Sequence, residues 1–339
     1  MITFYFDNKV IDEFTEVWTN EPIFQKLSKR EYGAEIHLFI IRPGKVFESP
    51  FEVINSKLIG KNYKIILWYL DTSDFDSFYD TTDINLLIEK GEDILVVCPD
   101  HIVDEDTMDE ELLFNFVNTY SMADAILEQQ NLMNSVIQFL FKDSKFYYRQ
   151  KHFLSLNGTP KPHRFELVSY VVDNNLLDNF DISFNSYLWD FGFDSLHLDL
   201  KDTTPYTSTK LNLPLYFNSY IDIVSMAKFK ESGVYLDEKI YKSLVCMKPF
   251  IILGQYKTLD VLKECGFQTF SDIIDESYDN EKDYVKRFEM ISSELNRISL
   301  LSINEVDKLY WKVEGVLIHN SNHLRKYINK INIKLLGSI

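Results

Sequence analysis

Short apolar runs alternate with helix-like segments through residues 1–145. Residues 65–70 (IILWYL) and 94–98 (ILVVC) are apolar or aromatic at every position, which is typical of strands buried on both faces of a parallel sheet. Two further β-rich runs are Ile2–Phe6 and Glu35–Arg42. Helical patterns lie between and after them, at Ile84–Lys90, Asp109–Tyr120 and Met122–Phe141. This alternation predicts an α/β fold.

A second β/α series follows the polar joint Lys142–Lys145. Four strands are expected, at Phe153–Leu156, Val234–Leu236, Pro249–Leu253 and Phe267–Phe270. Helical patterns predict six helices, at Arg164–Leu177, Asp237–Met247, Leu259–Cys265, Lys282–Leu301, Asn304–His319 and Asn322–Ile331. We therefore expect an N-terminal α/β domain at 1–145, a second α/β domain at 146–301, and C-terminal helices at 302–339 that pack back on the domains.

Composition and charge restrict the kinds of partner. Hydrophobic residues make up 45% and charged residues 26% of the chain, as in a globular protein, and the net charge is −17. This charge argues against a general nucleic-acid binder, because such proteins need a positive surface to displace counterions. The longest apolar runs are strand-sized, so no membrane span is expected. The first residues carry no basic segment of a secretory signal, which predicts a cytoplasmic protein.

Metal and thiol chemistry receive little support from the sequence. Cys98, Cys246 and Cys265 are widely spaced and fit neither a CxxC motif nor a disulfide framework, so we expect free thiols. Asp74-Phe75-Asp76 matches the DxD pattern of metal-dependent transferases, but such triplets arise by chance in an acidic chain. We predict neither a structural zinc nor another metal site.

Three segments carry a likeness to a known family. They are residues 151–164 (KHFLSLNGTPKPHR), 234–244 (VYLDEKIYKSL), and 248–254 (KPFIILG) with its continuation to Phe270. In this order and spacing they resemble phage and bacterial proteins related to the α1,3-fucosyltransferases. Those enzymes carry Tyr-x-Thr-Glu-Lys before a helix, followed by a strand that begins with Pro and ends with Gly. The likeness covers about a third of the chain.

The resemblance implies a GT-B fold and a transferase. GT-B proteins have two Rossmann-like domains with parallel sheets flanked by helices, and a C-terminal helical tail. The implied reaction is metal-independent and inverting, and moves a hexose-type sugar from a donor such as a GDP- or UDP-sugar to a glycan, a protein or a modified base. The donor is a substrate, and no cofactor is expected.

Two basic residues are candidates for the donor's diphosphate. Arg164 begins a helix after a strand and a Gly-Thr-Pro turn, where a guanidinium and a helix N-terminus both favour phosphate. Lys239 lies in the first turn of a later helix and would pair with the same diphosphate. Without a metal, fixed cations and amide groups must stabilise the leaving diphosphate. Both residues are also compatible with plain surface positions.

Four further residues complete the predicted donor site. Glu238 is the natural acceptor for ribose hydroxyls, and it too fits a solvated first-turn position. Asn157 and Gly158 would let the backbone approach the ligand closely. Tyr235 matches the aromatic position of the Tyr-x-Thr-Glu-Lys segment. By resemblance, Arg164, Glu238 and Lys239 correspond to donor-binding residues of the family.

The catalytic base is sought in the first domain. An inverting transferase needs a carboxylate that removes the proton of the acceptor hydroxyl. The strand Lys64–Leu70 is followed by Asp71 and Asp74, and ligands gather at the carboxyl ends of parallel strands. Asp71 is the first candidate and Asp74 the second. Asp100 and His101, after the strand that ends at Cys98, are further candidates.

Three positions depart from the family pattern. Met226 and Ala227 stand where the family has Glu followed by Asn or Thr, and Asp237 replaces the usual Thr before Glu238. An acid at position 237 would raise the electrostatic cost of binding a diphosphate nearby. An inactive homologue, for example a virion component or a protein that captures a nucleotide, is therefore the alternative function. A DNA-modifying transferase is a third possibility, against which the net charge argues.

Overall fold

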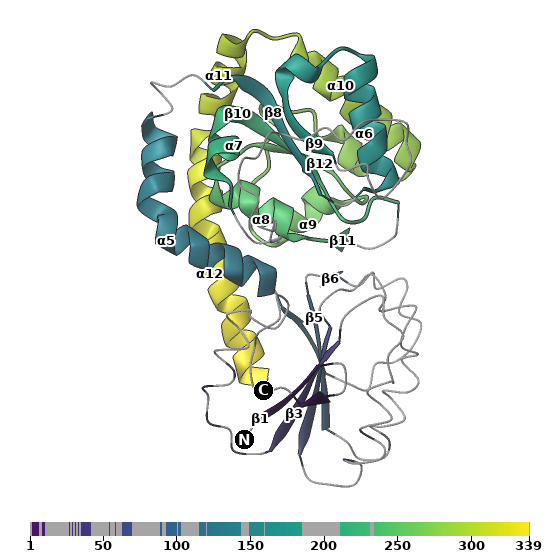
Figure 1. Cartoon of the computed structure of the whole chain (residues 1–339), viewed down its shortest axis with the longest axis vertical. Coiled ribbons are helices and arrows are strands. Elements are labelled where there is room, and N and C mark those ends of the chain that lie inside the picture. The colour runs from purple at the N-terminus through teal and green to yellow at the C-terminus, as the bar shows by residue number, and fades with distance from the viewer. Residues whose placement is uncertain are drawn as a thin grey trace. The chain divides into compact units, whose positions relative to one another are not determined.

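The structure is a computed structural model, and its chain divides into two compact units. Unit 1 comprises residues 1–125 and 328–339, and unit 2 comprises residues 126–327 (Figure 1). The described residues are 2–6, 9–10, 35–41, 63–69, 93–99, 101–102, 115–119, 121–143, 149–158, 160–184, 211–230 and 234–338, with the isolated positions 27, 29, 31, 33, 54, 58 and 89.

Unit 1 contains a six-stranded sheet with the order β2-β1-β3-β4-β5-β7. Its strands are β1 (Ile2–Phe6), β2 (Lys9–Val10), β3 (Ile36–Ile41), β4 (Lys64–Tyr69), β5 (Asp93–Pro99) and β7 (Asn115–Thr119). All neighbours are parallel except β1 and β2. Ile65, Ile66 and Leu67 are fully buried. The prediction of a parallel sheet from continuous apolar runs is confirmed.

The helix predicted at Asp109–Tyr120 is wrong in its second half. Residues Asn115–Thr119 form β7, which pairs in parallel with β5 from Leu95↔Asn115 to Pro99↔Thr119. The segment Asn-Phe-Val-Asn-Thr contains β-branched and aromatic residues that fit a pleated surface. Pairing with β5 gives the backbone of this segment its hydrogen-bond partners, and this tertiary contact outweighs the weak helical periodicity of the sequence. The helix that follows, α5 (Ser121–Asp143), agrees with the predicted Met122–Phe141.

Unit 2 contains a four-stranded parallel sheet with the order β12-β10-β8-β9. The strands are β8 (Lys151–Asn157), β9 (Phe180–Phe184), β10 (Ser219–Ser225) and β12 (Phe250–Leu253), and β11 is Val234–Tyr235. The chain goes from β8 outward to β9 and then returns across β8 to β10 and β12. The strand order therefore reverses between β8 and β10, the position where open α/β sheets bind their ligands.

Helices lie between the strands of unit 2 and follow its last strand. They are α6 (Pro162–Asp173), α7 (Leu213–Asn218), α8 (Glu238–Val245), α9 (Thr258–Glu264), α10 (Tyr284–Ser299), α11 (Ile303–Lys312) and α12 (Glu314–Ser338), with short 3-10 turns η3 (Leu177–Asn179) and η4 (Ser277–Asn280). The last helix, α12, continues past residue 327 into the residues of unit 1. Every residue of β10 and β12 is buried. The central strand β10 was not assigned from the pattern, because Asp222 interrupts its apolar run.

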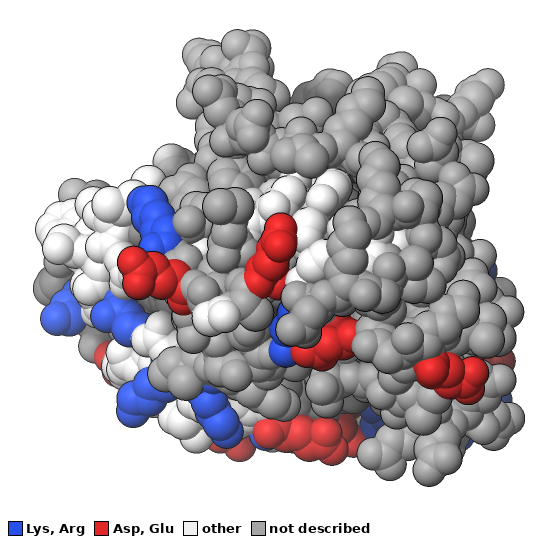
Figure 2. Space-filling model, turned by 90° about the horizontal axis from the view of Figure 1, so that it is seen from below, with Lys and Arg blue, Asp and Glu red and all other residues white. Residues whose placement is uncertain are grey.

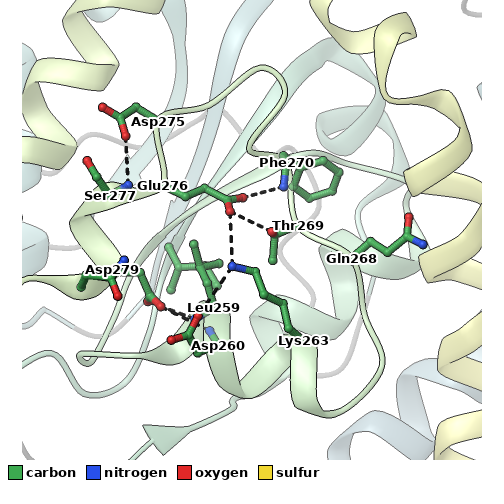
Figure 3. Close-up of polar contacts among 12 residues, drawn as sticks. Leu259, Asp260, Lys263, Gln268, Thr269, Phe270, Asp275, Glu276, Ser277 and Asp279 are labelled. Atoms are coloured by element: carbon green, nitrogen blue, oxygen red, sulfur yellow. Dashed lines mark hydrogen bonds and ion pairs between the residues drawn. The ribbon is translucent and has the colours of Figure 1, made fainter.

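The strand predicted at Phe267–Phe270 is absent, because side chains satisfy its backbone groups. The amide of Asn320 in α12 accepts from the Gln268 N–H at 2.8 Å and donates to the Gln268 carbonyl at 2.8 Å. Glu276 accepts from the Phe270 N–H at 2.5 Å and from the Thr269 hydroxyl at 2.8 Å, as Figure 3 shows. A segment whose polar groups are paired in this way needs no neighbouring strand.

Candidate functional site

Two buried polar atoms lie where the strand order of unit 2 reverses. Asn157 ends β8 and Ser225 ends β10, and each is 1% exposed. Asp222 of β10 pairs with Leu154 of β8, and the same parallel register continued by three residues brings Ser225 opposite Asn157. Within the described residues, Asn157 Oδ1 and Ser225 Oγ have no hydrogen-bond partner. Buried groups of this kind are nearly always satisfied, so the pair indicates a place where a ligand or water binds.

The helix that follows β8 has an open N-terminus. No side chain caps α6 within the described residues, and its first turn contains no acid. A Cβ placed on Gly158, in the preceding turn, would meet nothing within 4 Å. In contrast, Asp237 caps α8 by accepting from the Lys239 N–H, and Asp279 caps α9 by accepting from Leu259 and Asp260 (Figure 3). The N-terminus of α6 is therefore the one of these three best suited to an anion.

Side chains from the start of α6 bind the turn that follows β10. Arg164 Nη2 donates to the Ser225 carbonyl at 2.8 Å and to the Met226 carbonyl at 3.1 Å. His163 Nε2 lies 3.0 Å from the Met226 carbonyl, and Lys161 Nζ donates to the Ala227 carbonyl at 2.6 Å. These contacts hold the two segments on either side of the reversal point in fixed register.

Arg164 is buried, unlike an ordinary surface arginine. It is 2% exposed, and burial lowers the pKa of its guanidinium while the charges of Asp237 and Glu238 oppose that shift. A buried guanidinium requires hydrogen bonds and a counter-charge. The carbonyls of Ser225 and Met226 accept some of these hydrogen bonds. Arg164 thus lies at the predicted position, and its Nη2 group contacts the protein's own backbone.

A compact charged cluster begins α8. Lys239 Nζ lies 2.9 Å from Asp237 Oδ2 and 2.9 Å from Glu238 Oε1. Asp237 Oδ2 also accepts from the Ala227 N–H at 2.7 Å, and its Oδ1 accepts from the Lys239 N–H at 3.1 Å. Asp237 is 1% exposed. The expected electrostatic cost of an acid at position 237 is thus offset in the free protein by three hydrogen-bond donors and by the charge of Arg164.

The pKa values of this cluster follow burial and charge. Burial raises the pKa of Asp237, and the Lys239 ammonium opposes that shift. Burial acts in the same direction on Glu238, but the charge and hydrogen bond of Lys239, the charge of Lys242 and a backbone hydrogen bond together outweigh it, and the pKa of Glu238 is lowered. Burial disfavours the Lys239 ammonium, but its two carboxylate neighbours raise its pKa. The cluster consequently holds a charged lysine shared by two unequal carboxylates.

The other predicted site residues lie elsewhere in the chain or are not described. Asp71, Asp74 and Asp100 fall outside the described residues, so their predicted role as base remains a prediction. Tyr235 and His101 belong to strands, but their side chains are not described. Sequence reasoning did not identify Ser225, although a serine that directly ends an apolar strand is a signal for such a site.

Met226, the main departure from the family pattern, packs as a core residue. Its N–H continues the strand pairing by donating to the Leu253 carbonyl at 3.0 Å, and its side chain is 1% exposed. A Cβ on Gly254 would lie 2.9 Å from Met226 Cγ and 2.8 Å from Ile252 Cγ2. Gly254 is therefore required by close approach, and the methionine fills space at the end of β12.

No group of three metal-binding side chains occurs among the described residues. His319 and His323 lie four residues apart on α12 with their rings stacked at 5.6 Å. Their Nε2 atoms lie 3.1 Å and 2.9 Å from the carbonyls of Gly266 and Cys265, so they bind the end of α9. On the face shown in Figure 2, the described acidic and basic side chains are interspersed. None of the described helices is both long and apolar enough to cross a bilayer.

Comparison with protein families, with curated proteins and with solved structures found no match to this chain.

Proposed function

We propose that unit 2 binds the diphosphate of a nucleotide sugar where the strand order reverses between β8 and β10, and that the protein is a metal-independent glycosyltransferase of the GT-B type. One observation carries the proposal. The open start of α6 and the charged start of α8 approach the same strand end, Ser225–Ala227, beside the unpartnered Asn157 Oδ1. Fixed cations and amide groups of this kind stabilise a leaving diphosphate.

Each residue has a proposed role. Lys239 pairs with the diphosphate, because its side chain is 21% exposed while the side chain of Asp237 is 1% exposed. Arg164 adds positive charge near the diphosphate, and its hydrogen bond to the Ser225 carbonyl positions the end of β10. Glu238 accepts hydrogen bonds from ribose hydroxyls, and Asn157 Oδ1 accepts from a donor group of the ligand. A carboxylate of the first domain, Asp71 or Asp74, would serve as base toward a glycan or protein acceptor.

Calorimetric titration with GDP and UDP tests the site. We expect Lys239→Ala to weaken nucleotide binding about 10- to 100-fold, because a charge-assisted hydrogen bond is worth about 1.5–3 kcal/mol. The matched control is Lys263→Ala in α9, whose amine pairs with Asp260 and Glu276 and should leave binding unchanged. Equal nucleotide affinity of Lys239→Ala and the parent protein would refute the assignment.

A nucleotide-binding protein without transferase activity is the second candidate. It is favoured by Met226, which is a packed core residue where the family pattern has an acid. A thermal-shift screen with GDP, UDP and their sugars separates the two functions. Stabilisation together with donor hydrolysis or sugar transfer supports the enzyme. Stabilisation without either reaction supports the binding protein, and no stabilisation by any nucleotide supports a structural role.

A further inference from the structure

The carboxylate of Asp237 occupies donors that a phosphate would also use. Its two oxygens accept from the Ala227 N–H at 2.7 Å, from the Lys239 N–H at 3.1 Å and from Lys239 Nζ at 2.9 Å. An ammonium and amide groups at a helix N-terminus are common ligands of phosphate oxygens. In the free protein, the carboxylate thus occupies the Lys239 ammonium, which the proposed function assigns to the diphosphate.

The cluster around Asp237 contains buried charges of both signs. Arg164 and Lys239 are positive, and Asp237 and Glu238 are negative. The other charged or titratable groups that reach the same strand end or influence the cluster are Lys161, His163 and Lys242. A diphosphate that takes the Lys239 ammonium would leave the ionised Asp237 carboxylate buried, without its main counter-charge and next to the phosphate charges, which is costly away from water. Protonation of Asp237 removes this cost.

We propose that a diphosphate bound at this site takes up one proton from solvent onto Asp237, so that its affinity falls as the pH rises. This rests on the proposed function of the site. The phosphate replaces the carboxylate as the partner of the Lys239 ammonium, and the protonated Asp237 remains as a neutral hydrogen-bonding group. Asp237 is the better proton acceptor of the two acids because it is the more deeply buried. Burial already raises its pKa in the free protein.

UDP-glucose and GDP-mannose are the probes, because both of their phosphates are esterified and do not titrate near neutral pH. Calorimetry in buffers of different ionisation enthalpy counts the protons taken up. Between the pKa of Asp237 in the free protein and its higher pKa in the complex, we expect the parent protein to take up about one proton and its affinity to fall by up to about 10-fold for each pH unit. Asp237→Thr keeps a helix-capping hydroxyl, and we expect it to take up no proton and to bind about 10-fold tighter near pH 8.

The matched control is Asp279→Thr, which makes the same change at the cap of α9 and should behave as the parent protein. If Asp237→Thr does not fold, Asp237→Asn replaces it, since Asn is also a good cap. Binding without proton uptake, or weaker binding by the Asp237 variant near pH 8, overturns this inference and leaves the site intact. No binding of either donor by any variant between about pH 5.5 and about pH 8.5 overturns the proposed function as well.

Discussion

Asp222, in the middle of the central strand β10, makes the stability of unit 2 depend on pH. Its carboxylate is 4% exposed and accepts a 2.5 Å hydrogen bond from Ser243 of α8. Burial raises its pKa to about 6 from an ordinary 3.8, against the opposing effects of Ser243, Lys248 and Lys242. The proton is thus held more tightly in the folded than in the unfolded chain. This contribution to stability is full below about pH 4 and is lost as the pH rises toward about 6.

The magnitude follows from the difference between the two pKa values. At about 1.4 kcal/mol for each pH unit, ionisation of Asp222 removes about 3 kcal/mol from the free energy of unfolding between about pH 4 and about pH 7. Asp222→Asn keeps an acceptor for Ser243 and carries no charge. We therefore expect the variant to lack this loss and to be the more stable protein near pH 7.

Urea denaturation at several pH values measures the effect, and deuterium uptake by the β10 peptide assigns the transition to unit 2. Asp260→Asn is the control. Asp260 is a surface acid of α9 whose pKa is lowered by Lys257, so it contributes no loss of stability in this window. If Asp222→Asn and the parent protein lose stability equally between about pH 4 and about pH 7, the reasoning about Asp222 is wrong.

Three further predictions concern the elements around the site. Gly266→Ala should lower the free energy of unfolding by about 1–3 kcal/mol, measured by thermal denaturation, because φ is +91° and the new Cβ would lie 2.7 Å from the His323 ring. Gly158→Ala is the control, and it should lower stability much less because the space around its Cβ is open. Asp279→Ala should lower stability by about 1–2 kcal/mol through loss of the α9 cap, and Asp279→Asn should restore most of it in urea titrations. Tyr310→Phe removes a hydroxyl bonded to the Arg149 guanidinium and to a backbone carbonyl, and should cost about 1–3 kcal/mol by urea denaturation, whereas no loss would show that these bonds contribute nothing.

The parallel strands were the part of the fold most accessible from the sequence. β4, β5 and β12 contain continuous apolar runs, and a strand buried on both faces leaves that signature. β10 has the same environment but contains Asp222, whose burial depends on Ser243 and two lysines from other segments. No local pattern could show that these partners would be present.

The candidate site was predictable in its residue types and less so in its contacts. Asn157, Arg164, Glu238 and Lys239 could be selected because each begins a helix or ends a strand. The role of Asp237 could not be predicted, since it depends on the Ala227 N–H from a separate strand end. The strand prediction at Phe267–Phe270 was wrong for a similar reason, because Asn320 of α12, about 50 residues away in the sequence, supplies hydrogen bonds to this segment.

The central position of β10 has a consequence for how the protein folds. This strand pairs in parallel with β8 on one side and β12 on the other, through partners such as Leu154 and Phe250 that are distant in sequence. No hairpin can nucleate such a pairing, and parallel strands brought together across long loops assemble slowly. During synthesis, β8 and β9 must therefore remain an unfinished pair with an open apolar edge until Ser219–Ser225 has left the ribosome. Chaperone demand and aggregation should be greatest in that interval.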